Sequence, residues 1–231
     1  MTIESVSVRP SSRPLSATAV LFDLDGTLAD TVGDLVSALN RVRADHALAP
    51  VSIATLRAHA SSGARGMLGA GLGLGPDDER YAKMRDAFLD YYAKGLADTT
   101  ELFDGIESTL AALEARAIRW GIVTNKAERF TFPLLAALRL DRRASVVVCG
   151  DTTAHPKPHP APLLHAAAQL STAVERCVYV GDDLRDVQAG NAAGMATIVA
   201  KYGYLGDSGD CAGWPATGWI ESPGELLAWI A

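Results

Sequence analysis

Five short apolar runs, several of them rich in β-branched residues, recur along the chain. They occupy residues 18–23, 119–124, 145–150, 176–181 and 196–201. Each has the length of one strand and hardly alternates between apolar and polar residues, which is typical of strands buried on both faces. Between the runs, over 106–117 and 160–170, apolar residues return every three or four positions, as in helices. This order predicts an α/β fold with a parallel, doubly wound sheet.

One long segment, between the first run and Phe103, interrupts this order. Its apolar spacing is helical only, in one stretch around residues 35–42 and in another around 84–89. The glycine-rich sequence SSGARGMLGAGLGLGP lies between them and is typical of a flexible connection. An insertion after the first strand would lie over the carboxyl end of that strand, where open α/β sheets bind ligands.

The sequence therefore predicts a division into three parts. We expect a helical cap over 33–102, a core made of 18–32 and 103–231, and a loose N-terminal tail over 1–17. A last helix is expected to begin at Ser222, because Ser222 and Glu225 have the spacing of a capping box.

Composition narrows the possible partners. The 231 residues include 21 Lys and Arg and 27 Asp and Glu, which gives a net charge of −6, and no basic block is present. Nucleic acid and membranes are therefore not expected as partners. No apolar run is long enough for a transmembrane helix, and residues 1–16 lack the hydrophobic stretch of a secretory signal. A monomer or a weak homo-oligomer is the default expectation.

The three cysteines, Cys149, Cys177 and Cys211, are far apart in the sequence and odd in number. Two of them lie inside apolar runs, and none has the spacing of a metal site. We therefore expect small buried thiols in a reduced, cytoplasmic protein.

Polar clusters follow four of the predicted strands. They are DLDGT (23–27), TNK (124–126), KP (157–158) and GDDLRD (181–186). Because the carboxyl ends of parallel strands lie side by side, clusters that are far apart in the sequence can share one site. Each cluster alone is a weak signal, whereas their order and their placement at strand ends make the set specific.

Charge explains why these residue types would meet. Asp23 and Asp182 would crowd two carboxylates together, and like charges that close resist joint ionisation. Mg²⁺ binds one or two carboxylates, keeps several waters and leaves a place for a phosphate oxygen. Thr124 offers a hydroxyl, Asn125 an amide and Lys157 a positive charge for a phosphoryl group. Such a set suits phosphoryl transfer, in which a carboxylate can itself attack phosphorus to form an aspartyl-phosphate.

The four motifs resemble those of the haloacid dehalogenase superfamily, which has a Rossmann-like core and a cap. DLDGTLADT, VTNK, KP and VGDDLRDVQAG are similar to its phosphoglycolate phosphatase branch. The longer runs RWGIVTNKAERF, SSGARGML and GDDLRDVQAGNAAGM look closer to bacterial N-acetylmuramic acid 6-phosphate phosphatases. The resemblance implies an Mg²⁺-dependent phosphatase of a small phosphorylated metabolite. Its first candidate substrate is 2-phosphoglycolate, and N-acetylmuramic acid 6-phosphate is the alternative.

Carried over by position, the resemblance implies a role for each motif residue. Asp23 is the nucleophile and a metal ligand. Asp25 protonates the leaving alkoxide and then activates water, and its backbone carbonyl binds the metal. Asp182 is the second side-chain ligand of the metal. Three residues hold the phosphoryl group: Thr124, Asn125 and Lys157.

Four further positions keep two interpretations each. Asp183 and Asp186 either support the metal from an outer shell or stabilise the first turn of a helix. At the position of Asp183, Ser or Thr is commoner in the family. We interpret Lys126 as a helix-start or surface charge rather than a ligand. Arg65, in the glycine-rich part of the cap, either reaches the non-phosphate end of the substrate or is solvated.

Other activities share parts of this pattern. A dehalogenase shares the attacking aspartate but typically lacks an acid at the position of Asp25. A sugar phosphomutase shares all four motifs and would move phosphate between sugar positions. The chain could also be an inactive regulatory binding module, although the intact acid pair argues against this.

Overall fold

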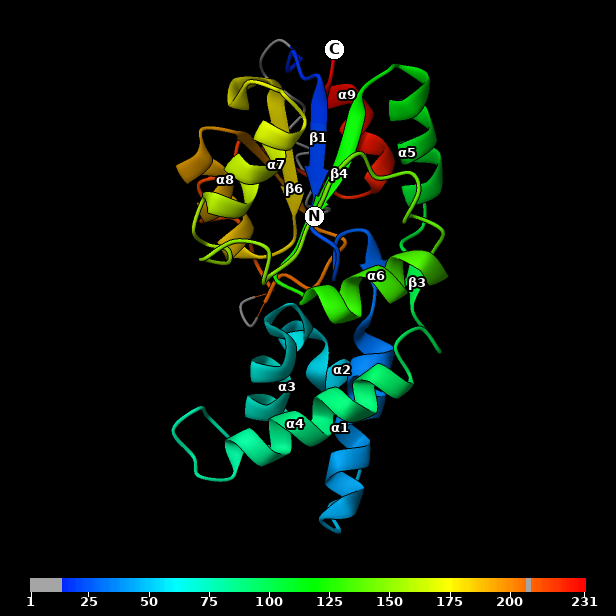
Figure 1. Cartoon of the computed structure of the whole chain (residues 1–231), viewed down its shortest axis with the longest axis vertical. Helices are drawn as coiled ribbons and strands as arrows, with labels where there is room; N and C mark the ends of the chain where they lie inside the picture. Colours follow the sequence, from blue (N-terminus) through cyan, green and yellow to red (C-terminus); the bar gives the residue numbers. More distant parts are fainter. Residues whose placement is uncertain (1–13, 207–208) are drawn as a thin grey trace, which may run out of the picture.

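The computed structural model describes residues 14–206 and 209–231, and its six-stranded parallel sheet lies among helices in the upper half of Figure 1. In spatial order the strands are β5 (Val147–Val148), β4 (Arg119–Val123), β1 (Ala19–Phe22), β6 (Cys177–Gly181), β7 (Ala196–Ala200) and β8 (Gly218–Ile220). Every neighbouring pair in this sheet is parallel. Each of the five apolar runs forms a strand, and the short β8 lies outside the predicted runs.

Alternate residues of the central strand β1 pack against two separate helical layers. Val20 and Phe22 belong to an apolar cluster that also contains residues of α5 (Ile106–Ala115), α6 (Glu128–Ala137) and α9 (Leu226–Trp229). Ala19 and Leu21 belong to a second cluster, with α7 (Ala161–Gln169) and α8 (Leu184–Ala193). The sheet is therefore covered on both faces, which confirms the predicted α/β core and explains why its strands do not alternate.

The last helix begins differently from the expectation. Residues Pro223–Glu225 form a 3₁₀ turn, η3, before α9, and no helical N–H donates to the Ser222 side chain. In that turn the N–H of Glu225 donates to the backbone carbonyl of Ser222 (3.2 Å). The predicted capping box is therefore wrong, because the tight turn uses the N–H that the serine hydroxyl would have accepted.

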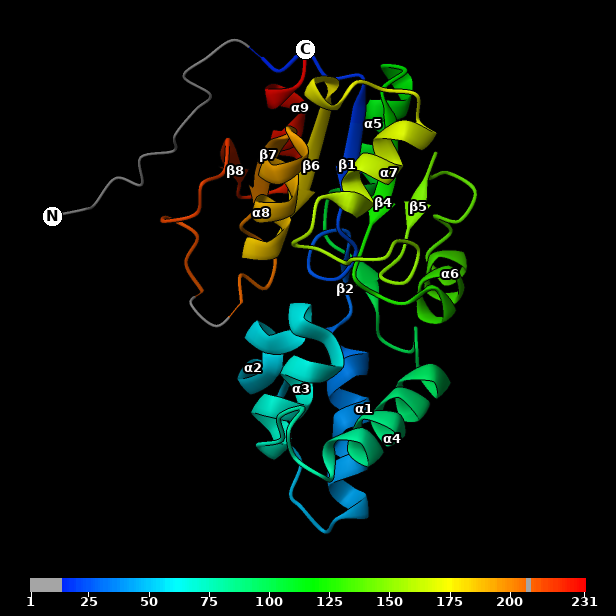
Figure 2. The same ribbon diagram turned by 60° about the vertical axis from the view of Figure 1, so that its left-hand side comes forward.

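The helical insertion forms a layer beyond the carboxyl ends of the strands (Figures 1 and 2). Its elements are α1 (Val32–Asp45), α2 (Ile53–Leu56), the 3₁₀ helix η1 (Arg57–Ser62), α3 (Gly63–Leu72) and α4 (Tyr81–Lys94). They share an apolar cluster, to which Leu39, Leu68 and Phe88 belong, that differs from the two clusters of the sheet. This separate packing supports the cap that we propose over 33–102.

The glycine-rich sequence at 61–76 is not the flexible connection that was expected. Most of it belongs to α3, which buries Met67 and Leu68. Gly71 lies so close to Leu39 of α1 that a Cβ atom at this position would overlap the leucine side chain. Each glycine costs about 0.5–1 kcal/mol of helix stability relative to alanine. Apolar burial and the close approach of the two helices offset this cost.

Two short strands mark the passage between core and cap. β2 (Ala29–Asp30) and β3 (Glu101–Leu102) pair in antiparallel fashion. Beside them, the buried carboxylate of Asp34 accepts hydrogen bonds from the N–H and the hydroxyl of both Thr99 and Thr100, at 2.6 to 3.1 Å. These hydrogen bonds satisfy the buried carboxylate and connect α1, at the start of the cap, to residues 99–100 at its end.

Within the described ranges, every helix is too short or too polar to cross a membrane. All three cysteines are buried and free of disulfide bonds, and two of them lie in the apolar runs that predict their burial. Of the predicted tail, residues 1–13 lie outside the described part of the chain.

Candidate active site

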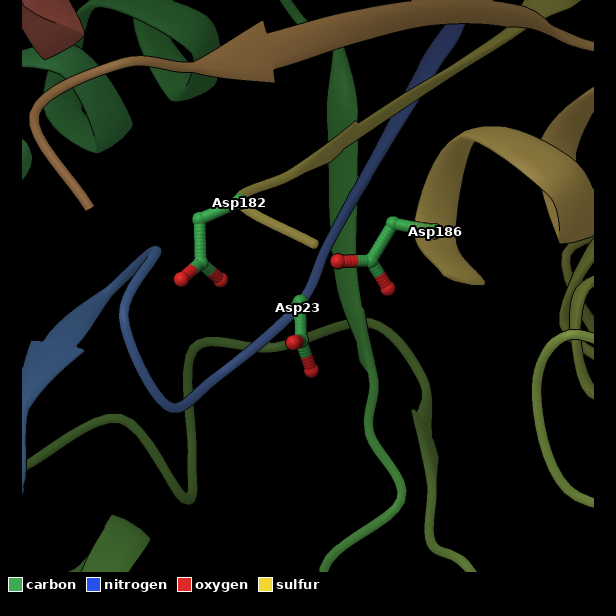
Figure 3. A group of neighbouring side chains, drawn as sticks. All are labelled: Asp23, Asp182 and Asp186. Atoms are coloured by element: carbon green, nitrogen blue, oxygen red, sulfur yellow. The ribbon is translucent and has the colours of Figure 1, made fainter. Parts of the chain in front are cut away.

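Three carboxylates meet at the carboxyl edge of the sheet (Figure 3). Asp23 follows β1, Asp182 follows β6, and Asp186 lies in the first turn of α8. One oxygen of each lies within 4.8 Å of the other two, and all three side chains are buried. The fold thus brings Asp23 and Asp182 together, as the argument from strand ends predicts.

The cluster carries more negative charge than its surroundings neutralise. Burial raises the pKa of Asp23 to about 7, against the attraction of Lys157, and the charges of Asp186 and Asp25 also raise it. Burial, together with Asp23 and Asp186, raises the pKa of Asp182 well above the usual carboxyl range. Lys157 Nζ lies 2.9 Å from Asp23 Oδ1, but it lies 2.7 Å from Asp186 Oδ1 as well, so one cation is shared between two of the three carboxylates. A bound cation would relieve the remaining repulsion between the carboxylates.

The donor atoms fit a hard divalent cation, because such ions prefer carboxylate oxygens. Asp182 is oriented by Thr27 Oγ1, which donates to Oδ1 (3.1 Å), and by Ser61 Oγ and the N–H of Tyr204, which donate to Oδ2 (both 2.9 Å). Ser61 belongs to the cap, so the cap touches a predicted metal ligand directly. The carboxylate of Asp25 is not part of the group of three, which leaves its backbone carbonyl as the predicted ligand.

The carboxylates of Asp186 and Asp183 are occupied by the protein itself. Asp186 Oδ1 accepts hydrogen bonds from Lys157 Nζ (2.7 Å) and the Tyr179 hydroxyl (3.1 Å), and its Oδ2 accepts from the N–H of Asp183 (3.0 Å). Asp183 Oδ1 accepts from the N–H of Arg185 (2.9 Å), so the two acids form a capping box at the start of α8. Both acids stabilise this helical turn, and Asp186 also orients Lys157.

Lys157 is a buried cation between two of the acids. Its Nζ lies 2.9 Å from Asp23 and 2.7 Å from Asp186, and it donates a hydrogen bond to the Tyr179 hydroxyl (2.8 Å). Burial by itself would lower the pKa of Lys157, but Asp186 and Asp23 raise it to about 12. The ammonium therefore keeps its charge in the cavity, where a phosphoryl group would need it.

Thr124 and Asn125 directly follow β4, and both line the cavity. The Asn125 carboxamide exchanges two hydrogen bonds of 2.9 Å with the backbone N–H and C=O of Lys157, whose bond to Pro158 is cis. Thr124 Oγ1 accepts a hydrogen bond from the N–H of Lys126 (3.1 Å). Asn125 thus positions Lys157, in addition to the phosphoryl contact predicted for it.

Lys126 lies in the site, and its interpretation as a helix-start or surface charge is wrong. α6 begins at Glu128, and the Lys126 side chain is 8% exposed. Its Nζ lies 2.8 and 3.0 Å from the two carboxylate oxygens of Asp25, and Thr31 Oγ1 donates to the same carboxylate (2.6 Å). The sequence does contain a signal for this position, because Lys126 follows the end of a predicted strand and comes directly after the predicted site residues Thr124 and Asn125.

A cavity of about 280 Å³ lies between these groups and the cap. Its core side carries the acids and lysines described above, whereas its other side is largely apolar. The apolar lining includes Leu35, Ala60, Ala64, Phe88, Leu89 and Phe130. Arg65 is exposed and is not part of the lining, so the structure does not place it at the predicted substrate contact.

A model of the haloacid dehalogenase-like hydrolase family matches residues 20–200. The chain belongs to this family. It is 41% identical over 209 residues to the N-acetylmuramic acid 6-phosphate phosphatase of Pseudomonas aeruginosa, covering 90% of this chain and 92% of the relative. It is 42% identical over 209 residues to the phosphoglycolate phosphatase of Xanthomonas campestris, covering 90% of this chain and 94% of that relative. The crystal structure of a predicted phosphoglycolate phosphatase from Haemophilus somnus matches with a TM-score of 0.81 at 25% identity, covering 91% of this chain and 96% of that one.

In this haloacid dehalogenase-like hydrolase, two polar links at the passage from core to cap involve Arg185 and Tyr204, to which the sequence predicts no role. Arg185 forms a bidentate pair with Asp183 (both contacts 2.8 Å), and its Nη2 also donates to the Ser61 carbonyl (2.9 Å). The Tyr204 hydroxyl accepts the N–H of Thr31 (2.7 Å) just before α1. Such links between distant segments leave no local pattern in the sequence.

Proposed function

We propose that this hydrolase is a phosphatase, which releases phosphate from a small phosphorylated metabolite. The observation that carries the proposal is the meeting of Asp23, Asp25 and Lys157 at one cavity, beside carboxylates that fit a divalent cation. The phosphatase names of the relatives support it. We propose Mg²⁺ as the ion, because it binds few carboxylates and leaves a position for a phosphate oxygen.

In the proposed reaction, Asp23 attacks phosphorus, and its new bond forms as the ester bond between phosphorus and oxygen breaks. Asp25 gives its proton to the leaving oxygen. Water then attacks the aspartyl-phosphate while Asp25 takes up the proton, so that phosphate leaves and Asp23 is regenerated. Lys157 and Thr124 hold the phosphoryl oxygens, and Mg²⁺, when bound, neutralises part of their charge.

We propose a phosphate monoester that carries a carboxylate as the substrate, with 2-phosphoglycolate as the first candidate. N-acetylmuramic acid 6-phosphate is the second candidate, because the apolar lining at Leu35, Phe88 and Leu89 would pack against its acetyl and lactyl methyl groups. Relatives with the two names are 41% and 42% identical to this chain, so similarity does not separate the two substrates.

The test is a phosphate-release assay on the purified protein, with Mg²⁺ and after its removal by EDTA. We expect hydrolysis that is lost in EDTA and restored by Mg²⁺, and the values of kcat/KM for the two candidates decide between them. Transfer of phosphate between sugar positions without release would indicate a phosphomutase. If neither candidate nor p-nitrophenyl phosphate is hydrolysed, the phosphatase proposal fails and the inactive binding module gains support.

A further inference from the structure

Two polar side chains approach each other inside the cavity, at the boundary of cap and core. Lys126 comes from the loop between β4 and α6, and Tyr92 comes from α4 of the cap. Lys126 Nζ lies 4.8 Å from the centroid of the Tyr92 ring, and both side chains are buried. The reaction proposed above gives neither of them a role.

The Tyr92 hydroxyl has no hydrogen-bond partner among the described residues, although the side chain is only 2% exposed. The ring is held in place by Phe88 (centroids 6.3 Å apart, stacked) and Phe130 (5.5 Å). A buried hydroxyl without an acceptor is destabilising, so a phenylalanine would be more favourable for packing alone. Burial also raises the pKa of Tyr92 to about 12, so the hydroxyl keeps its proton and can donate it in a hydrogen bond.

Lys126 has an N–H group to spare. An ammonium carries three N–H donors. Two of them reach the carboxylate oxygens of Asp25, at 2.8 and 3.0 Å, which leaves the third for the side of the ammonium on which Tyr92 lies. The cavity therefore contains a charged donor beside a hydroxyl whose own proton has no acceptor among the described residues.

The other cations around the cavity are committed or exposed. Lys157 pairs with two carboxylates, and Arg185 forms a bidentate pair with Asp183. Arg129 is exposed, with its guanidinium over the Phe130 ring (4.5 Å). Lys126 is thus the buried cation of the cavity that still has a donor for a second anion.

We propose that Lys126 Nζ and the Tyr92 hydroxyl bind the carboxylate of the substrate, an inference that rests on the proposed phosphatase function. An oxygen between the two groups receives one charged N–H and one neutral O–H, and charge-assisted hydrogen bonds of this kind are the strong ones. Lys126 also contacts Asp25, the proposed proton donor to the leaving oxygen. The carboxylate therefore lies on the leaving-group side of the cavity. Core and cap each supply one donor, so the site is complete only while α4 lies against the core.

The test compares substrate pairs that differ in the carboxylate. 2-Phosphoglycolate is paired with ethyl phosphate, and N-acetylmuramic acid 6-phosphate with N-acetylglucosamine 6-phosphate. The carboxylate preference is kcat/KM for the member with a carboxylate divided by kcat/KM for the member without one. This ratio isolates carboxylate binding, because a disturbance of Asp25 changes kcat/KM for both members. We expect Lys126→Met to lower this preference by about 10- to 100-fold and Tyr92→Phe by about 3- to 10-fold.

Lys83→Met and Tyr91→Phe are the matched controls. Lys83 is exposed on α4, and the Tyr91 hydroxyl donates to Asp45 (2.8 Å) rather than into the cavity. Neither substitution should change the carboxylate preference. Tyr92→Phe keeps the packed ring, so it tests the inference even where Lys126→Met fails to fold.

A preference that is lost in both cavity variants and kept in both controls supports the inference. It is overturned if the wild-type protein does not prefer the carboxylate member of the pair it hydrolyses, or if Tyr92→Phe and Lys126→Met keep the wild-type preference. Absence of hydrolysis with all four compounds would contradict the phosphatase function instead, so the two failures are distinguishable.

Discussion

The core and the cap contribute different kinds of side chain to one cavity. The core contributes buried charges, with Lys157 between Asp23 and Asp186. The cap contributes mainly apolar side chains, among them Phe88 and Leu89. The edge of a sheet holds charged groups in place because neighbouring strands constrain the backbone. The cap packs around its own apolar cluster, so side chains on its surface can be substituted without disturbing the charged groups of the core. The difference indicates that the core supplies the reacting groups, whereas the shape and polarity of the substrate site depend on both parts, because Lys126 comes from the core and Tyr92 from the cap.

Few polar contacts among the described residues cross between the two parts. Ser61 of η1 donates to Asp182, Arg185 donates to the Ser61 carbonyl, and Arg57 of η1 donates to Asp30, each at 2.9 Å. These contacts hold the cap against the acids. If the cap opens to admit substrate, as we propose, the contact of Ser61 with Asp182 has to break.

The largest effect is expected where the core carries the reaction. Asp23→Asn removes the nucleophile and should lower kcat by at least about 10³-fold. Thermal unfolding should be unchanged or shifted upward, because the substitution replaces a buried carboxylate whose ionisation is disfavoured. Mass spectrometry after mixing with substrate should detect a transient phosphoryl group on residue 23 in the wild type alone. Near-native turnover by the variant would contradict the assignment.

Two lysine variants compare the interior of the core with the boundary to the cap. Lys157→Met leaves Asp23 and Asp186 without their shared counter-charge, and breaking a buried ion pair costs about 3–5 kcal/mol. Lys126→Met leaves only Asp25 without its counter-charge, and the side chain of Asp25 is 15% exposed. This substitution should therefore lower the free energy of unfolding by less than Lys157→Met does. Urea unfolding in EDTA measures both. Equal losses of stability would show that the two lysines do not differ in this way.

The charge cluster of the core predicts how stability depends on pH. The pKa of Asp23 is about 7 in the folded protein without metal and ordinarily 3.8, so between these values the folded state binds more protons than the unfolded state. The contribution of Asp23 to the free energy of unfolding therefore falls as pH rises from about 4 to about 7, by at most about 1.4 kcal/mol per pH unit. Asp182, with its raised pKa, acts in the same direction.

Thermal unfolding in EDTA from about pH 5 to about pH 8 checks this slope. Because Mg²⁺ binds the ionised carboxylates, it should raise the unfolding temperature more at about pH 8 than at about pH 5. A stabilisation by Mg²⁺ that is the same at both pH values would argue against binding at these carboxylates.

The smallest effect is expected at a cap residue outside the cavity. The sequence-based hypothesis for Arg65 requires Arg65→Ala to raise KM, whereas its exposed position on α3 predicts a KM within about twofold of the wild type. Steady-state kinetics with the better of the two substrates decides between them. A clear increase in KM with little change in kcat would restore the sequence-based hypothesis.

Core and cap also differ in how far their structure can be predicted from the sequence. The strands could be predicted because burial on both faces makes each of them a continuous apolar run, as at Val20 and Leu21. The helix α3 could not, because its glycines suggest flexibility unless the contact of Gly71 with Leu39 is known. At Ser222 the local pattern predicts a cap that the 3₁₀ turn does not form.

The sequence by itself determined the α/β class and the meeting of Asp23 with Asp182, because these depend on local periodicity and on the rule that parallel strands end at one edge. It determined the family through the resemblance of its four motifs. Only the tertiary structure decided that Lys126 faces Asp25 and Tyr92, and that Arg65 faces solvent. The physical reason is that the partner of a long charged side chain depends on which elements pack beside it. The contact between α4 and the loop after β4 arises only when cap and core come together.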